Sequence, residues 1–225
     1  MNKKQPTYGS SLHYENSNGK EYFEWQDRHG EIQGIINARK FMSFDFSDSA
    51  ILDFGAGGGE LLNNLDAREK LAVEVNPHAH TKLKKAGLRH YFSIEDVNAN
   101  SIDYVISHHS LEHVPYPIQA LREFRRVLKQ DGWLLLWIPI DDWRNQKSFH
   151  LKDINNHLHT WTPQLIGNCI VEAGFDGTKL RTAIVNHALF PGYTYFYELP
   201  GFDLACKLFS LVSRRRQIFI MLQNS

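Results

Sequence analysis

A glycine-rich turn after an apolar run constrains the fold of this chain more than any other segment. Ala50-Ile51-Leu52-Asp53 leads into Phe54-Gly55-Ala56-Gly57-Gly58-Gly59, and Glu60–Leu65 then has the composition of a helix start. Alternate glycines let the backbone turn tightly at positive φ and bring peptide N–H groups close to a ligand. This order of strand, glycine turn and helix predicts a parallel α/β sheet with a ligand at the carboxyl ends of its strands.

A second acid lies where nucleotide-binding sheets hold a ribose. The apolar run Leu71-Ala72-Val73 ends in Glu74, a position at which an acid commonly accepts hydrogen bonds from ribose hydroxyls. Glu60 takes the place of the third glycine of the dinucleotide fingerprint, and its carboxylate would repel a pyrophosphate lying on the helix N-terminus. The two features therefore indicate an adenosine-bearing cofactor without phosphate, S-adenosyl-L-methionine, in preference to NAD or FAD.

Composition bounds the class of protein. The 225 residues suffice for one well-cored domain, and acidic and basic side chains are equal in number, which argues against nucleic acid as a partner. Cys169 and Cys206 both lie in apolar helical contexts, which predicts free buried thiols in a reducing compartment. The first residues contain no apolar stretch of a secretory signal, and nothing approaches a membrane span. We therefore expect a cytoplasmic protein without membrane contact.

Apolar periodicity and turn residues divide the chain into alternating strands and helices. Residues 1–21 are polar and are expected to be loosely ordered, ahead of a single domain over 22–225. The strands are expected at 49–53, 70–75, 89–94, 101–107, 133–140, 179–185 and 217–222. The helices are expected at 22–42, 60–65, 77–84, 117–128, 163–173 and 203–212. This alternation predicts a doubly wound α/β sheet.

Two further motifs make the sequence resemble a known family. Ser101–Val114 and Arg126–Gly132, together with the glycine turn and Glu74, resemble the class I S-adenosylmethionine-dependent methyltransferases. The resemblance covers about residues 22–222, with the motifs in the family's order. It implies a Rossmann-like, mostly parallel seven-stranded sheet whose last strand is antiparallel. The segment 157–175 is also similar to small methyltransferases of bacterial capsule and lipopolysaccharide gene clusters, which implies a role in polysaccharide biosynthesis.

The resemblance also implies which residues hold the cofactor. They are Asp53, Gly55, Gly57, Gly59, Glu74, Val75, Asn76, Glu95, Asp96 and His108. The glycines would line the methionine and ribose portion, Asp53 would face the amino group, and Glu74 would bind the ribose hydroxyls. Val75 and Asn76 would flank the adenine. Either Glu95 or Asp96 would meet its amino group, and His108 would lie beside the sulfonium.

Histidines dominate the candidates for catalysis. Methyl transfer is an in-line displacement for which alignment and a dry pocket suffice, but a hydroxyl acceptor also needs a base, and histidine serves near neutral pH. Four histidines follow the fourth and fifth strands, where ligands bind in such sheets: His109, His113, His157 and His159. His109 could instead shape the pocket and His113 could cap or pack locally. We expect a small acceptor, in the first place a hydroxyl of a sugar or sugar nucleotide.

Several alternatives stay open at this point. A metal site could form from Asp141, Asp142, Asp153 and the two histidines of the same loop, but metal-dependent relatives carry an acid directly after strand four, where this chain has Ser107-His108, so no metal is predicted. A nicotinamide-dependent oxidoreductase is opposed by Glu60. A catalytically silent cofactor-binding partner would have the same glycine turn.

Two segments outside these motifs also carry unusual composition. The aromatic segment 189–197 could hold a sugar, cap a pocket or pack on the last helix, and the region 189–212 is a candidate homodimer interface. Arg214-Arg215-Arg216 is interpreted as a solvated helix end.

Overall fold

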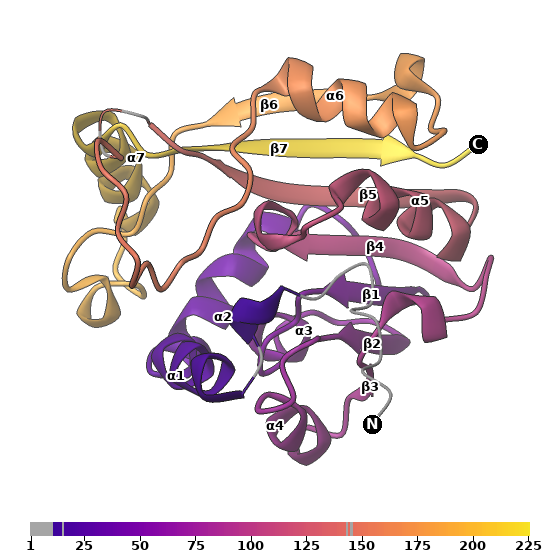
Figure 1. The fold of residues 1–225 in the computed structure, drawn as a ribbon, viewed down its shortest axis with the longest axis horizontal. Coiled ribbons are helices and arrows are strands. Elements are labelled where there is room, and N and C mark those ends of the chain that lie inside the picture. The colour runs from indigo at the N-terminus through magenta and orange to yellow at the C-terminus, as the bar shows by residue number, and fades with distance from the viewer. Residues whose placement is uncertain (1–10, 15, 143, 145) are drawn as a thin grey trace.

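The computed structural model describes residues 11–14, 16–142, 144 and 146–225 (Figure 1). A single sheet in the order β3-β2-β1-β4-β5-β7-β6 forms its centre. The strands are β1 (Ala50–Phe54), β2 (Glu69–Val73), β3 (Arg89–Tyr91), β4 (Ile102–His108), β5 (Leu128–Ile140), β6 (Arg181–Val185) and β7 (Arg216–Gln223). The pairs from β3 to β5 are parallel, whereas β7 is antiparallel to both β5 and β6. The predicted doubly wound sheet with an antiparallel last strand is thus confirmed.

Seven α-helices and six short 3-10 turns connect the strands in the described residues. The α-helices are α1 (Asn16–Asp27), α2 (Gly30–Ala38), α3 (Glu60–Asn63), α4 (His80–Lys85), α5 (Pro117–Val127), α6 (Pro163–Glu172) and α7 (Phe202–Ser213). The 3-10 turns are η1 (Leu12–Tyr14), η2 (Arg39–Phe41), η3 (Ile94–Asp96), η4 (Leu111–His113), η5 (Gly177–Lys179) and η6 (Tyr193–Tyr195). Among the described residues, none of these helices combines the length and apolarity that a bilayer crossing requires.

The predicted single helix over 22–42 is wrong in its extent. The chain forms α1, turns at Arg28–His29, and continues as α2 and η2. After this turn, α2 packs closely on α3, and the contact requires glycine at two positions. A Cβ at Gly30 would lie 2.9 Å from Glu60 Oε1, and one at Gly34 would lie 2.5 Å from Glu60 Cβ. Of the segment 1–21, residues 1–10 and 15 lie outside the described residues, and α1 begins at Asn16, ahead of the expected start at Tyr22.

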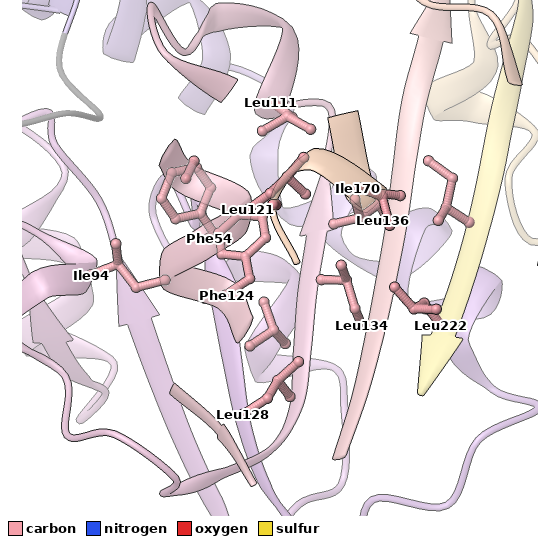
Figure 2. Packing of buried hydrophobic residues seen from close by; sticks show 14 of the residues in the cluster. Phe54, Ile94, Leu111, Leu121, Phe124, Leu128, Leu134, Leu136, Ile170 and Leu222 are labelled. Carbon is pink, nitrogen blue, oxygen red and sulfur yellow. The ribbon is translucent and has the colours of Figure 1, made fainter. Parts of the chain in front are cut away.

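One layer of the core lies between the sheet and helices α5 and α6 (Figure 2). Alternate strand side chains point to this face, including Phe54 of β1 and Leu134 of β5, and they join Leu121, Phe124 and Ile170 from the two helices. The rings of Phe54 and Phe124 lie edge to face with centroids 4.8 Å apart. This layer fixes α5, and therefore the turn η4 that precedes it, over the middle of the sheet.

A second layer covers the opposite face of the sheet. The intervening strand residues Ile51 and Ile106 pack there with Phe41 of η2, Leu62 of α3 and Leu83 of α4. Because helices cover both faces, the central strands are apolar at nearly every position, as parallel sheets require.

A third, smaller cluster closes one side of the sheet's carboxyl edge. Ile36 of α2 packs with Phe202 and Cys206 of α7, and Phe190 and Tyr193 of the aromatic segment pack against them. In Figure 1, α1, α2, α7 and the loop after β5 lie together at the side toward which the parallel strands point. These elements surround the carboxyl ends of the parallel strands, where ligands bind in sheets of this type.

Candidate active site

A large cleft opens at the carboxyl ends of β1, β4 and β5, with a volume of about 1630 Å³. Helices α1 and α2, the loop after β5 and the segments around residues 187–193 and 214–217 border it. The predicted site residues in its lining are Asp53, Gly55, His108, His109, His113 and His157. The predicted site residues outside its lining are Gly57, Gly59, Glu74, Val75, Asn76, Glu95, Asp96 and His159.

The glycine turn has the backbone that its sequence predicts. Gly55, Gly57 and Gly59 have φ values of 78°, 54° and 86°, in the left-handed region. A Cβ at Gly55 would lie 2.2 Å from the hydroxyl of Ser110, and one at Gly59 would lie 2.4 Å from a methyl of Leu88. Glycine is therefore required at these two positions by both conformation and space.

Glu74 ties the tip of β2 to this turn. Its carboxylate accepts hydrogen bonds from the backbone N–H of Gly57 (2.8 Å) and of Asn76 (2.7 Å). Burial raises the pKa of Glu74, and these hydrogen bonds oppose the rise. The Asn76 side chain donates to the Gly19 carbonyl at 2.8 Å, so the start of α1 lies over this part of the turn.

Asp53 presents a carboxylate without a partner to the cleft. Its side chain is only 2% exposed, and within the described part of the chain no hydrogen bond or ion pair reaches it. Burial, then the charges of Glu74 and Glu60, raises the pKa of Asp53 to about 8. A cationic ligand group at this point would compensate the buried acid. The ammonium and sulfonium groups of S-adenosylmethionine fit this requirement.

The predicted adenine contacts lie at the edge of the sheet. Glu95 and Asp96 form the exposed turn η3 after β3, where the Ser93 hydroxyl accepts a hydrogen bond from the Glu95 N–H at 3.3 Å. Neither residue lines the cleft in this conformation, and the proposed contact of one of them with the adenine amino group stays a prediction.

A half-buried lysine, Lys40, contacts the first predicted histidine, His108. Lys40 Nζ lies 2.6 Å from His108 Nε2 and 3.1 Å from Gln217 Oε1, above the ring of Trp137. Burial lowers the pKa of Lys40 to about 7, and burial together with Lys40 holds the pKa of His108 well below its usual value. His108 therefore accepts a hydrogen bond from Lys40 as a neutral ring.

His109 stacks on His108, with ring centroids 4.4 Å apart. Its backbone is left-handed (φ 54°), its N–H donates to the Trp137 carbonyl at 2.8 Å, and burial lowers its pKa to about 3. Its Nε2 has no hydrogen-bond partner among the described residues. This ring is too weak a base to accept a proton readily near neutral pH.

His113 and His157 lie next to each other, with ring centroids 4.9 Å apart. Burial lowers the pKa of His113 to about 4. Burial alone would also lower the pKa of His157, but the hydrogen bond from its Nδ1 to Asp141 (2.8 Å) and the nearby acids outweigh it, and the net shift is upward. His157 is therefore the most basic of the predicted histidines in the cleft whose pKa is shifted.

The side chain of His159 makes different contacts from that of His157, although only Leu158 lies between the two in the sequence. Its Nε2 donates to the Val114 carbonyl at 3.0 Å, and its ring lies against Trp161 with centroids 5.5 Å apart. The contacts of His159 anchor the loop to the turn after β4, outside the cleft.

Three features of the cleft are not predicted as site residues by the sequence. Lys40 and Glu112 line it, and so do the arginines 214–216. Nothing in the helical pattern around Lys40 marks it as different from the other lysines of the chain. Glu112 could have been suspected from its position beside His113 within the motif that carries the resemblance.

Comparison with known proteins assigns the family. The family described as methyltransferase domain matches residues 25–180, more than half of the chain, and the chain belongs to this family. No curated protein matches the sequence.

Solved structures with the same fold include three methyltransferases. One, from Haloferax volcanii in complex with the Trm112 activator, is 14% identical, with 92% of this chain and 95% of that chain covered and a TM-score of 0.63. A second, from Thermotoga maritima, is 17% identical, with 92% and 96% covered and a TM-score of 0.63. A third, an N-methyltransferase from Haemonchus contortus bound to S-adenosylhomocysteine, is 13% identical, with 98% and 60% covered and a TM-score of 0.63.

Family and fold together confirm the predicted class. The protein is an S-adenosylmethionine-dependent methyltransferase, and S-adenosyl-L-methionine is its cofactor. Hydride transfer with a nicotinamide cofactor, the alternative that Glu60 opposed, is not the chemistry of this family.

The lowered pKa of Lys40 predicts a stability that depends on pH. The charged form of Lys40 is disfavoured in the folded state, so the penalty is complete below pH 7 and declines as pH rises toward the unfolded value near about 10.4. Lys40→Met should therefore raise the melting temperature by several degrees more at pH 6 than at pH 9. Lys85→Met, at an exposed position, should behave alike at both pH values. Equal shifts for Lys40→Met in thermal denaturation at the two pH values would contradict this assignment.

Proposed function

We propose that this methyltransferase transfers the methyl group of S-adenosylmethionine to a hydroxyl of a sugar or sugar nucleotide, with His157 accepting the proton. The observation that carries the proposal is the Asp141–His157 pair, which opens into the same cleft as Asp53 and Gly55. A base whose ring is oriented by a carboxylate is the arrangement that general-base catalysis uses. Asp141 holds Nδ1, so Nε2 of His157 is available to the acceptor.

The shape and charge of the cleft support this acceptor class. A volume of about 1630 Å³ exceeds what one cofactor needs, and Trp25 and Tyr193 supply aromatic faces on which a sugar ring can pack. Arg214, Arg215 and Arg216 stand exposed at the rim, which suits the phosphates of a nucleotide-linked sugar. These arginines, first interpreted as a solvated helix end, thus gain a binding role in the proposal.

The setting of the proposed reaction follows the same inference. The similarity of segment 157–175 to methyltransferases of capsule and lipopolysaccharide gene clusters supports a role in polysaccharide biosynthesis. Cys169 and Cys206 are both free thiols, which fits the cytoplasm. The balanced net charge argues against a nucleic acid acceptor.

For the cofactor, we propose that Asp53 faces the amino group and Glu74 the ribose hydroxyls. Glu74 accepts hydrogen bonds from two backbone N–H groups, and the neighbouring Asn76 side chain bonds to Gly19 of α1, so the approach of a ribose to Glu74 would involve a shift of these contacts. Val75, Asn76 and either Glu95 or Asp96 remain the proposed adenine contacts.

Binding of S-adenosylhomocysteine tests the role of Asp53. Asp53→Asn removes a charge-assisted hydrogen bond worth about 1.5–3 kcal/mol, so calorimetric affinity should fall by about 10–100-fold. Because the raised pKa keeps Asp53 protonated at pH 7, binding to the wild type should also release a proton, and affinity should increase from pH 6 to pH 8. Glu172→Gln, an exposed acid on α6, is the matched control and should bind like the wild type. An Asp53→Asn variant with wild-type affinity and no change in proton release would refute the assignment.

Turnover tests the role of His157. His157→Ala should lower kcat on a sugar-nucleotide acceptor by about 10²–10⁴-fold while S-adenosylhomocysteine affinity is retained. His159→Ala should lose a structural hydrogen bond, which lowers thermal stability by about 1 kcal/mol, with kcat close to that of the wild type. If the two variants lose activity to the same degree, His157 has no special role as a base.

The region 189–212 remains the proposed homodimer interface. Leu204, Leu208 and Leu211 form an exposed apolar stripe on α7, at 60%, 55% and 55% exposure, and Tyr195 is exposed nearby. Sedimentation equilibrium should give the mass of two chains for the wild type and of one chain for Leu208→Glu, because a charge on the stripe opposes its burial. A monomeric wild type at all concentrations would contradict the interface.

A further inference from the structure

Glu112 is a second buried acid of the cleft, besides Asp53, that has no side-chain hydrogen bond among the described residues. Its side chain has no solvent exposure, and neither carboxylate oxygen has a hydrogen-bond partner among the described residues. A buried carboxylate without hydrogen bonds or a counter-charge is strongly destabilising, and proteins keep such a group mainly where a cation or ligand will satisfy it. The mechanism proposed above makes no use of it.

Two imidazoles face this carboxylate. His113 Nε2 lies 3.8 Å from Glu112 Oε1, and one ligand atom each of Glu112, His113 and His157 fall within 4.8 Å of one another. A metal ion with bonds of about 2.1 Å spaces its ligand atoms by about 3–3.5 Å. The widest spacing in the cluster therefore needs to contract by up to about 1.3–1.8 Å to hold one ion.

The Nδ1 atom of each of the two imidazoles already has a partner in the protein. His157 Nδ1 bonds to Asp141 at 2.8 Å, and His113 Nδ1 lies 3.5 Å from the Asn156 carbonyl. Histidines that bind metals commonly donate one ring N–H to a carboxylate or carbonyl, which fixes the ring and leaves the other nitrogen for the ion. Both rings in this cluster are arranged in that way.

The fold holds the three residues together independently of any ligand. The backbone N–H groups of Leu158 and His159 both donate to the Glu112 carbonyl, at 2.9 and 3.1 Å. These two bonds fasten the loop after β5 to η4, so His157 is placed beside the Glu112–His113 pair by main-chain contacts.

We propose that Glu112, His113 and His157 form a binding site for one divalent transition-metal ion, with Asp141 as a positioning residue. Two imidazoles and one carboxylate suit zinc, manganese or iron(II), and leave coordination positions open. All three residues line the cleft, so those positions face the space assigned to the acceptor.

The role of the ion rests on the proposed function and refines it. A divalent ion beside the acceptor hydroxyl lowers the pKa of that hydroxyl. His157 would then act as a ligand and not as the base, and the acidified hydroxyl would release its proton to solvent in the cleft. The site itself is independent of the identity of the acceptor.

Metal binding by the whole, chelator-treated protein tests the site without any turnover. Calorimetric titration with Zn²⁺, and with Co²⁺ followed by its visible absorption, should give one equivalent bound by the wild type. Glu112→Gln and His157→Ala should each weaken binding by at least about 100-fold, and Asp141→Asn by about 10–100-fold. His150→Ala, an exposed histidine of the same loop, should bind the ion like the wild type.

The variants separate failure of the metal site from failure of the base. Retained binding of S-adenosylhomocysteine shows that each variant is folded. Absence of stoichiometric metal binding by the wild type, or equal binding by Glu112→Gln, would overturn the site. If His157→Ala nevertheless lost turnover in that case, His157 would act as the base directly; if turnover were also unaffected, both proposals would fail.

Discussion

The convergence of three acids around one glycine turn is the constraint on which the cofactor end of this structure depends. Glu74 closes the turn by accepting the N–H of Gly57, and the Val73 carbonyl accepts the N–H groups of Gly55 and Ala56 at 2.9 and 3.2 Å. Glu60, at the start of α3, is neutralised by Lys82, 2.6 Å away. Asp53 has no such partner among the described residues, and the other two acids make its charge still more costly. A cationic ligand at the turn would stabilise the ionised form of these buried acids, whereas a pyrophosphate would disfavour it further.

Much of this fold could be predicted because its signals are local. Apolar runs of strand length, glycine turns and Pro117 and Pro163 at helix starts mark most elements to within a few residues. The direction of β7 could not be predicted in this way, since an apolar run does not indicate whether its strand is parallel or antiparallel to its neighbours. The antiparallel direction was predicted only from the resemblance to a family. The break between α1 and α2 was missed for a different reason. The packing that accompanies the break is the contact of Gly30 and Gly34 with Glu60, which is remote in sequence.

The candidate site shows the same division between local and long-range information. The glycine turn and the acids at the tips of β1 and β2 could be predicted from spacing alone. Lys40 could not, because it is unusual only through the residues that surround it, whereas the only sequence signal for Glu112 is its place beside His113. His157 and His159 look equivalent in the sequence, yet one bonds to Asp141 and the other to the Val114 carbonyl. Long-range hydrogen bonds to the Glu112 carbonyl decide which of them reaches the cleft.

The charges that line the cleft differ in sign between the part that would bind the cofactor and the part that would bind the proposed acceptor. The end formed by Asp53 carries an unpaired acid, and the rim formed by Arg214, Arg215 and Arg216 carries exposed cations. A cationic cofactor is therefore favoured at the Asp53 end, and the proposed phosphate-bearing acceptor would be favoured at the arginines. His113, His157 and Glu112 line the same cleft, so the groups proposed to activate a hydroxyl border the space that the two substrates would share. For the proposed sugar-nucleotide acceptor, neither substrate would be electrostatically suited to the place of the other, and this would favour a binding order in which methyl group and acceptor face each other.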